Sequence, residues 1–311
     1  MSVRTLVVDD FAPIRRMVCS TLEQSSGFHL VGEAQDGLEA VERATELQPD
    51  LVLMDIGLPS LNGVQAARRI RDRNPKTKVL FVSHEELSHS IVRAISTVDA
   101  LGFVHKLHLH RDLPLALKMA LEDKHFISGR ADECCGSMDS LGHAIQFYSS
   151  ENIFVESLAG FFGTALLQGR AAIAMATAAH LDALARRLAA DGLDVEGATR
   201  HGTYVPLKVE DLAPKLLSAD REQFLEGIGD FIDGAARRSK TGGASVGGEF
   251  SAVVCSQGHV EAGMRIEQTS NNTIRHRRHV DVLCAAPLPG KPQEDRTFHS
   301  LCAEHTTVYV Q

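Results

Sequence analysis

The first 126 residues alternate between short apolar runs and amphipathic stretches. The apolar runs cover residues 6–8, 30–31, 51–54, 79–82 and 102–104. Helical spacing of apolar positions recurs over residues 12–25, 37–47, 63–73, 87–98 and 112–126. Continuous apolar strands that alternate with helices are typical of a parallel sheet covered on both faces. The pattern therefore predicts five strand–helix units in a doubly wound α/β fold.

A second alternation of the same kind begins at His143. We expect strands at residues 144–148, 171–176, 204–207, 244–250 and 280–286. We expect helices at residues 151–168, 180–190, 221–239 and 258–277. The residues between the two alternating regions are small and polar without periodicity. The sequence thus predicts an α/β domain at 1–126, a linker at 127–142 and a second α/β domain at 143–311.

The overall composition excludes several classes of protein. The chain has 311 residues, of which 44% are hydrophobic and 23% charged, as in globular proteins of about two domains. It contains no apolar run of about 18 residues, and two carboxylates follow its first short apolar run. Neither a membrane span nor a secretory signal is therefore expected, and we predict a cytoplasmic protein. The net charge of −8, with neither half basic, argues against a nucleic-acid partner.

The six cysteines show no C-x-x-C spacing, and two of them are adjacent. We interpret them as scattered reduced thiols of a cytosolic chain. They are Cys19, Cys134, Cys135, Cys255, Cys284 and Cys302.

Polar residues follow the expected strands of the first domain. Asp9 and Asp10 follow the first strand, Asp55 the third, Ser83 the fourth and Lys106 the fifth. In a parallel α/β sheet, ligands bind beyond the carboxyl ends of the strands. Converging carboxylates repel one another unless a hard cation such as Mg²⁺ joins them. With the lysine and the hydroxyl, such a site can stabilise a phosphoryl group during transfer.

These residues resemble the receiver domain of two-component response regulators over nearly all of residues 1–126. The matching pieces are Val-Val-Asp9-Asp10, Leu-Met-Asp55-Ile-Gly57-Leu-Pro59, Asn62-Gly63, Ser83 and Gly102-Phe103-Val-His-Lys106. The resemblance implies a flavodoxin-like fold in which Asp55 accepts phosphate from a histidine kinase. It also implies that Asp10, Asp55 and the Gly57 carbonyl bind Mg²⁺ directly, and Asp9 largely through water.

The same resemblance assigns roles to three further residues. Ser83 would hydrogen-bond the phosphoryl oxygen, and Lys106 would pair with it. Phe103 matches the switch aromatic whose burial follows the inward shift of Ser83. Two positions depart from the family pattern. His84 stands where a small residue is usual and could restrict access to the site, and Leu107 replaces a proline after the lysine.

Three histidines surround the lysine, His105, His108 and His110. Imidazoles suit Zn²⁺ or Ni²⁺, so a metal site is conceivable. If the segment leaves a strand, however, residues 105 and 108 point to opposite faces, which disfavours that reading.

The second half lacks a phosphate-binding loop of the G-x-x-x-x-G-K-[S/T] type and a G-x-S-x-G elbow. It does contain Gly247-Gly248-Glu249-Phe250, which resembles the signature of diguanylate cyclases. In that family the signature forms a β-hairpin whose glutamate binds metal. The match is four residues long and lies in a glycine-rich stretch, so cyclase activity stays a minor alternative.

A longer stretch, residues 143–287, resembles the MEDS domain, a sensory module of methanogen and methylotroph regulators. The main matching pieces are His143-Ala-Ile-Gln-Phe-Tyr148, Leu167-Gln-Gly-Arg170 and Ala171-Ala-Ile-Ala-Met-Ala-Thr177. The resemblance implies a degenerate RecA-type fold that has lost its nucleotide loop. Residues 148–153 stand where the nucleotide-binding loop would be. The negative charge of Glu151 at the start of a helix would disfavour the binding of a phosphate group there.

A ligand pocket bounded by Tyr148, Glu249 and His276 is one hypothesis for this domain. The ordinary alternative is a set of strand ends and a solvated basic helix terminus at residues 275–279.

Together these features predict a non-enzymatic response regulator of a two-component phosphorelay, phosphorylated at Asp55 with Mg²⁺ as cofactor. Its partners would be a histidine kinase or phosphotransfer protein, with a phosphorylation-dependent homodimer as a further hypothesis and the downstream target left open. Phosphorylation would switch the interactions of a MEDS-like domain that does not bind DNA. The main alternative is that the second domain senses a small molecule and controls the receiver.

Overall fold

Parallel strands and helices make up both parts of the chain in the computed structural model, which describes residues 2–129, 142–277 and 279–311. The chain divides into two compact units, Met1–Gly129 and Arg130–Gln311. Both units are mixed α/β, as the alternating pattern predicts.

The strands of the first unit lie in the order β2-β1-β3-β4-β5-β6, and every neighbouring pair is parallel. Their bounds are β1 Val3–Val8, β2 Phe28–Ala34, β3 Leu51–Met54, β4 Lys78–Ser83, β5 Gly102–His105 and β6 His125–Ser128. The first five strands follow the flavodoxin-like order. This order puts β1 and β3 side by side at the centre of the sheet, where their carboxyl ends meet.

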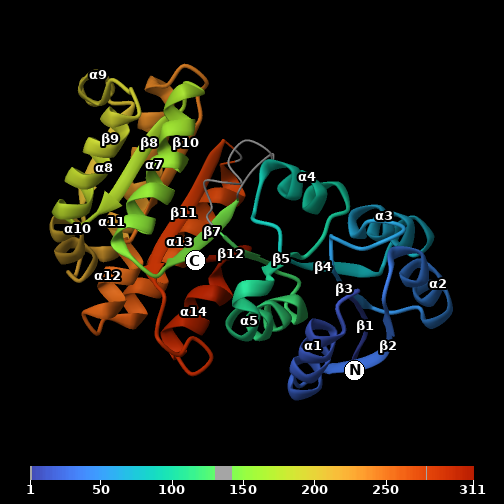
Figure 1. Cartoon of the computed structure of the whole chain (residues 1–311). Coiled ribbons are helices and arrows are strands. Elements are labelled where there is room, and N and C mark those ends of the chain that lie inside the picture. The colour runs from blue at the N-terminus through green and yellow to red at the C-terminus, as the bar shows by residue number, and fades with distance from the viewer. Residues whose placement is uncertain (1, 130–141, 278) are drawn as a thin grey trace. The chain divides into compact units, whose positions relative to one another are not determined.

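The helices of this unit cover both faces of its sheet, α1 and α5 on one side and α2, α3 and α4 on the other (Figure 1). Their bounds are α1 Ala12–Gln24, α2 Gly37–Leu47, α3 Gly63–Arg73, α4 His89–Thr97, the 3₁₀ turn η1 Lys106–His108 and α5 Leu109–Leu121. Asp36 caps α2 and Asn62 caps α3 by accepting hydrogen bonds from first-turn amides, which starts each helix just after a strand.

The sixth strand, β6, differs from the sequence expectation. Helix α5 ends at Leu121, and residues 125–128 pair with β5 instead of finishing a helix and opening a linker. Four residues are too short to show a period, so the sequence pattern does not distinguish this strand from the end of a helix and the start of a linker. Gly102 has φ +142°, and a Cβ there would lie 1.8 Å from the Phe126 carbonyl oxygen. The β5–β6 pairing therefore requires glycine at this position. Residues 130–141 of the expected linker lie outside the described residues.

The strands of the second unit lie in the order β12-β7-β11-β10-β8-β9, again all parallel. Their bounds are β7 His143–Tyr148, β8 Ala171–Ala176, β9 Tyr204–Lys208, β10 Ala244–Gly248, β11 Val280–Pro287 and β12 Thr307–Val310. A parallel α/β sheet is compatible with the RecA-type fold, which stays a prediction for this unit.

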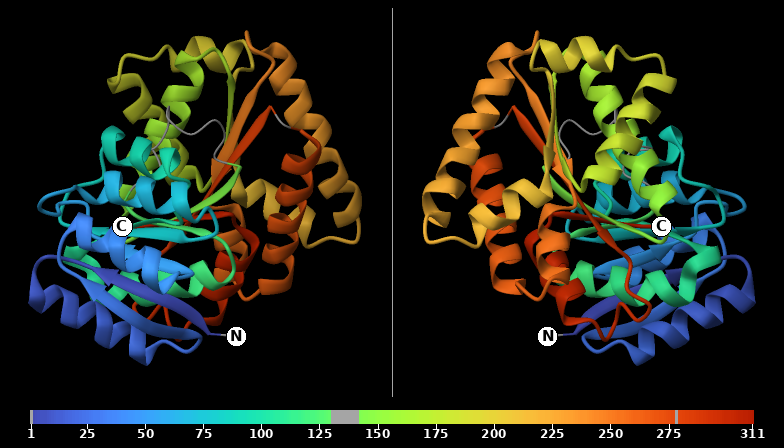
Figure 2. Two further views of the ribbon diagram at one scale, coloured as in Figure 1. Left: turned by 90° about the vertical axis from the view of Figure 1, so that its right-hand side faces the viewer. Right: turned by 90° about the vertical axis from the view of Figure 1, so that its left-hand side faces the viewer.

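Helices lie on both sides of this sheet as well, with α7 and α8 on one side and α11, α12 and α13 on the other (Figure 2). The bounds are α7 Glu151–Leu167, α8 Ala178–Ala190, α9 Val195–Arg200, α10 Val209–Leu216, α11 Arg221–Arg238, α12 Phe250–Ser256, α13 Val260–His276 and α14 Arg296–Glu304. The expected strand at 244–250 ends at Gly248, and Phe250 already begins a helix. The sequence pattern also missed α9, α10, α14 and β12, which are all short.

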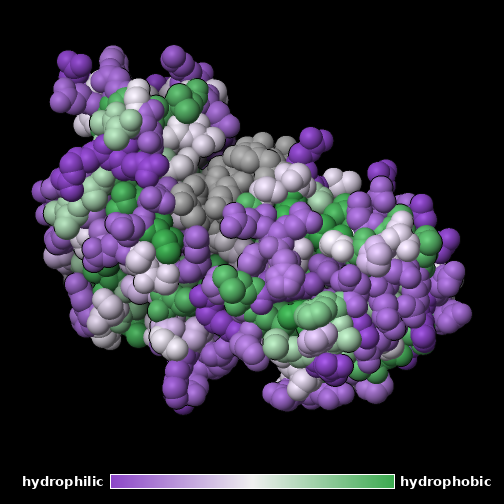
Figure 3. All heavy atoms as spheres, in the orientation of Figure 1, coloured by the Kyte–Doolittle hydropathy of each residue, from purple (hydrophilic) through white to green (hydrophobic). Residues whose placement is uncertain are grey.

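One face of the molecule is largely polar. Figure 3 shows a face on which hydrophilic residues predominate and hydrophobic ones form small groups among them. Among the described residues, no helix combines the length and the apolar character needed to cross a bilayer.

Candidate functional site

Two central strands bring the candidate carboxylates of the first unit together. Val8 at the end of β1 pairs with Met54 at the end of β3, and the Asp55 amide donates a hydrogen bond to the Val8 carbonyl at 2.9 Å. Asp9 and Asp55 therefore leave neighbouring strands at the same edge of the sheet. Ser83 is the last residue of β4, and Lys106 directly follows β5.

Lys106 joins the two carboxylates. Its Nζ lies 2.8 Å from Asp9 Oδ2 and 2.8 Å from Asp55 Oδ2. The three residues are almost completely buried, with exposed fractions of 6%, 2% and 5% for Lys106, Asp9 and Asp55. The second carboxylate oxygens are held by backbone amides, Asp9 Oδ1 by Phe11 at 2.9 Å and Asp55 Oδ1 by Gly57 at 3.3 Å. Both carboxylates are thus fixed in orientation.

The donor set of this site suits a hard divalent cation. Carboxylate oxygens of Asp9, Asp10 and Asp55 all lie within 4.8 Å of one another. Asp10 is exposed, which leaves one side open to the water molecules that Mg²⁺ retains in proteins. Burial raises the pKa of Asp9 above its ordinary value; Lys106 offsets part of this rise, and the charge of Asp55 adds to it. A cation here would relieve the repulsion between the carboxylates.

The two residues assigned to the switch are both buried. Ser83 is 1% exposed, and its Oγ accepts a hydrogen bond from the Glu85 amide at 3.3 Å. Phe103 is 0% exposed and belongs to a hydrophobic core cluster of the first unit.

The two residues that depart from the family pattern, His84 and Leu107, are both exposed. The His84 side chain is exposed, and its carbonyl lies 3.1 Å from His105 Nε2. His105 Nδ1 accepts a hydrogen bond from the Leu107 amide at 3.2 Å, so both ring nitrogens have partners. His105, His108 and His110 do not form one of the potential metal-binding groups found among the described residues.

Of the three residues considered for a pocket in the second unit, two come together. Tyr148 at the end of β7 forms a hydrogen bond with Glu249, which follows β10. Burial raises the pKa of Tyr148, and the charge of Glu249 raises it further. His180 Nδ1 contacts Glu249 Oε1 at 2.6 Å, a partner that sequence reasoning missed because nothing marks a helix-borne histidine. His276 instead lines a separate depression beside Arg277.

The Gly247-Gly248-Glu249-Phe250 tetrapeptide does not form a β-hairpin. Its glycines end β10, a strand that runs parallel to both of its neighbours, and Phe250 begins α12. All four residues are buried. The geometry that the cyclase resemblance requires is therefore not present at these residues.

An apolar cavity of about 330 Å³ lies between the sheet of the second unit and helices α10 and α11. Most of its wall is aliphatic or aromatic. Its lining includes Ile173, Met175, Leu212, Phe224, Ile228 and Val246.

The raised pKa of Asp9 predicts how the stability of the first unit depends on pH. The folded state binds the Asp9 proton more tightly than the unfolded chain does, so stability is lost as the pH rises from 3.8 through the folded-state pKa. We expect Asp9→Asn to raise Tm at neutral pH in the presence of a chelator, with a gain that shrinks on acidification. Thermal denaturation across this pH range, with the exposed Asp72→Asn as control, measures the effect. A lower Tm of Asp9→Asn at neutral pH would contradict the expectation.

Comparison with known families agrees with this geometry. The model of the response regulator receiver domain matches residues 5–118. The model of the MEDS domain, the methanogen/methylotroph DcmR sensory domain, matches residues 142–287.

Individual relatives share the receiver part. Chemotaxis protein CheY of Thermotoga maritima is 38% identical over 106 residues, which cover 34% of this chain and 87% of that protein. A protein-glutamate methylesterase/protein-glutamine glutaminase of Alkalilimnicola ehrlichii is 44% identical over 101 residues, 32% of this chain and 25% of that protein. The response regulator domain of Thermotoga maritima CheB aligns with 35% identity and a TM-score of 0.36, covering 39% of this chain and 95% of that structure.

The first curated relatives are matched over only 25% to 31% of their own length. CheY, by contrast, is matched over most of its length. The chain therefore belongs to the response regulator family, with a receiver domain followed by a MEDS domain.

Proposed function

We propose that Asp55 accepts a phosphoryl group from a histidine kinase or a phosphotransfer protein and that this changes the interactions of the MEDS domain. The observation that carries the proposal is the position of Lys106 Nζ, 2.8 Å from carboxylate oxygens of both Asp9 and Asp55. A buried cation held between two carboxylates is suited to stabilise the charge that a transferred phosphoryl group brings.

In the proposed reaction an Asp55 carboxylate oxygen attacks the phosphorus of a phosphohistidine. The new P–O bond forms as the P–N bond breaks, and the electron pair returns to the imidazole nitrogen, which takes up a proton from solvent. Asp55 acts as the nucleophile, and the Gly57 amide and Lys106 hold its carboxylate in place. Lys106 would then move its contact from the free carboxylate to a phosphoryl oxygen.

Asp9, Asp10, Asp55 and the Gly57 carbonyl would hold Mg²⁺ in this site. When bound, the ion supplies positive charge that reduces repulsion between the carboxylates and the incoming phosphoryl group. The convergence of the three carboxylates within 4.8 Å supports this part of the proposal.

We further propose that phosphorylation shifts the receiver between two populations. Ser83 would hydrogen-bond the phosphoryl group and hold the inward state, in which Phe103 is buried. The burial of Phe103 in the core is compatible with the inward state. The changed surface around β4, α4, β5 and α5 would then bind a protein partner or a second receiver.

The oligomeric state tests the switch. Beryllofluoride with Mg²⁺ mimics a phosphoryl group on aspartate, so we expect it to increase the dimeric fraction of the full chain, measured by light scattering after size exclusion. Asp55→Asn with beryllofluoride is the matched control and should stay unchanged. An unchanged mass of the wild-type chain, with beryllofluoride bound, would argue against dimerisation as the output.

As a second candidate, we propose that the MEDS domain binds a small apolar molecule in the cavity of about 330 Å³ beside α10 and α11. Cavities of this size with mostly apolar walls are typical of small-molecule sites. Native mass spectrometry of the full chain would reveal a retained ligand. A chain that carries no ligand after purification and also fails to bind apolar probes would count against small-molecule binding by this domain.

A further inference from the structure

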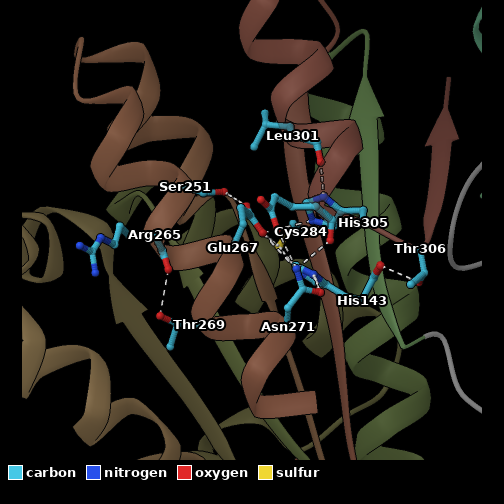
Figure 4. Close-up of polar contacts among 11 residues, drawn as sticks. His143, Ser251, Arg265, Glu267, Thr269, Asn271, Cys284, Leu301, His305 and Thr306 are labelled. Atoms are coloured by element: carbon cyan, nitrogen blue, oxygen red, sulfur yellow. Dashed lines mark hydrogen bonds and ion pairs between the residues drawn. The ribbon is translucent and has the colours of Figure 1, made fainter. Parts of the chain in front are cut away.

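Four buried side chains that the proposed phosphorelay does not use meet in the second unit (Figure 4). They are His143 at the start of β7, Glu267 on α13, Cys284 on β11 and His305 between α14 and β12. Their exposed fractions are 2%, 0%, 8% and 1%. One nitrogen, oxygen or sulfur atom from each lies within 4.8 Å of the others. We call this set the His–Glu–Cys–His cluster.

The spacing of these atoms fits a tetrahedron around a metal ion. Glu267 Oε2 lies 3.0 Å from His143 Nε2, 3.2 Å from His305 Nε2 and 3.3 Å from Cys284 Sγ. Cys284 Sγ lies 3.5 Å from His143 Nε2. Zinc bonds of about 2.0–2.1 Å to nitrogen or oxygen and about 2.3 Å to sulfur place tetrahedral ligands about 3.3–3.6 Å apart. Small outward shifts would therefore admit the ion.

Hydrogen bonding with Asn271 shows which ring nitrogen of His143 carries a proton. The Asn271 amide nitrogen donates to the Glu304 carbonyl at 2.9 Å, so the Asn271 Oδ1 is left as an acceptor. His143 Nδ1 lies 3.0 Å from this Oδ1 and must carry the proton of that hydrogen bond. With the proton on Nδ1, Nε2 is the nitrogen that faces Glu267 and Cys284.

His305 is oriented in the same way. Its Nδ1 donates to the Leu301 carbonyl at 2.6 Å, which leaves the Nε2 lone pair facing Glu267 Oε2. This Nε2 is buried, and Glu267 Oε2 lies 3.2 Å from it across the cluster. The other carboxylate oxygen, Glu267 Oε1, accepts a hydrogen bond from Ser251. Two imidazole nitrogens and a carboxylate oxygen thus converge on one point, where a positive charge, either a proton on an imidazole or a metal ion, holds them together.

We propose that the His–Glu–Cys–His cluster binds one Zn²⁺ ion through His143 Nε2, His305 Nε2, the Glu267 carboxylate and the Cys284 thiolate. Binding replaces the S–H bond of Cys284 by a Zn–S bond and releases the proton to solvent. Two anionic ligands then balance the dipositive ion, so the buried site carries no net charge. Nitrogen and sulfur ligands suit Zn²⁺, whereas Mg²⁺ prefers oxygen.

The hydrogen bonds that orient the two histidines are those of a preorganised metal site. Histidine ligands of metals nearly always donate their second N–H to a carbonyl, carboxylate or amide oxygen, as both histidines do here. Because all four ligands come from the protein and are buried, the site is closed and has a structural role rather than a catalytic one. His305 lies beyond residues 142–287, so the fourth ligand comes from outside the match to the MEDS family.

Metal content and cobalt spectra of the full chain test this inference. We expect about one zinc per chain after purification, and a chelator-stripped chain that takes up one Co²⁺ with the intense visible bands of tetrahedral cobalt and a near-ultraviolet thiolate band. The Asp9–Asp10–Asp55 site would hold Co²⁺ only with oxygen ligands and weak absorption, so the spectra distinguish the two sites. X-ray absorption at the zinc edge should show one sulfur and three nitrogen or oxygen ligands.

Substitutions of single residues show which side chain gives rise to each cobalt absorption band. Cys284→Ser should lose the thiolate band, while Cys19→Ser, a buried thiol of the receiver with the same exposed fraction of 8%, should keep it. Asn271→Ala should weaken zinc affinity about 10–100-fold by releasing His143. A folded wild-type chain that binds neither zinc nor cobalt would overturn the inference, and so would a ligand shell without sulfur. These readouts do not depend on phosphorylation of Asp55.

Discussion

Asp55→Asn is expected to take up no phosphoryl group from a small phosphodonor with Mg²⁺, whereas the wild-type chain takes up one. The amide of asparagine is not a nucleophile, but it keeps the shape of the side chain and can still accept the Gly57 amide hydrogen bond. The variant should therefore fold and lose only the chemistry. Intact mass spectrometry counts the phosphoryl groups directly.

Asp72→Asn on α3 is the matched control, because Asp72 is exposed and lies outside the site. It should be phosphorylated like the wild type. Uptake by Asp55→Asn would assign the acceptor to another residue. No uptake by a folded wild-type chain would mean that the site is closed to donors, with the exposed His84 as the first residue to replace by alanine. The first unit would then act as a constitutive docking module.

Lys106→Met is expected to slow phosphorylation about 10²–10³-fold, the usual cost of losing one preorganised charge-stabilising donor. Methionine keeps much of the apolar stem, so the change removes mainly the cation. The rate of mass gain with a small phosphodonor gives the effect, and Lys76→Met, an exposed lysine, is its control.

Lys106→Met should also lower Tm at neutral pH. Without the lysine, the nearly buried Asp9 and Asp55 carboxylates face each other unpaired, and removing one partner of a buried ion pair is destabilising. Mild acid should restore part of the loss, because protonating one carboxylate removes the repulsion. Wild-type phosphorylation kinetics in Lys106→Met would show that Lys106 holds the carboxylates without taking part in transfer.

The receiver site could be predicted from sequence because its residues stand at positions that the pattern marks. Asp9, Asp55 and Ser83 lie at or directly after the ends of continuous apolar runs, and such runs are buried parallel strands. Neighbouring parallel strands end at one edge, so the side chains had to meet once the strand order was 2-1-3-4-5. Lys106 follows the same rule on β5.

The elements that escaped prediction are short or change type within a few residues. Strand β6 has four residues, and its pairing with β5 becomes evident only from the close approach of Gly102 to Phe126. The chain changes from strand to helix within two residues after Gly248. The start of α12 at Phe250 therefore looked like the last residue of a continuous strand. Local periodicity carries no information at that length.

By itself, the sequence determined the α/β class of both units, the two families and the acidic edge that would accept a phosphoryl group. Only the tertiary structure decided that His143, Glu267, Cys284 and His305 share one buried point. Their positions are 17 to 162 residues apart along the chain and follow no ligand spacing, so neither strand nor helix periodicity relates them. The placement of β11 beside β7, and of α13 and α14 against that sheet, brings them together. Such contacts arise from packing between distant segments, which no local pattern records.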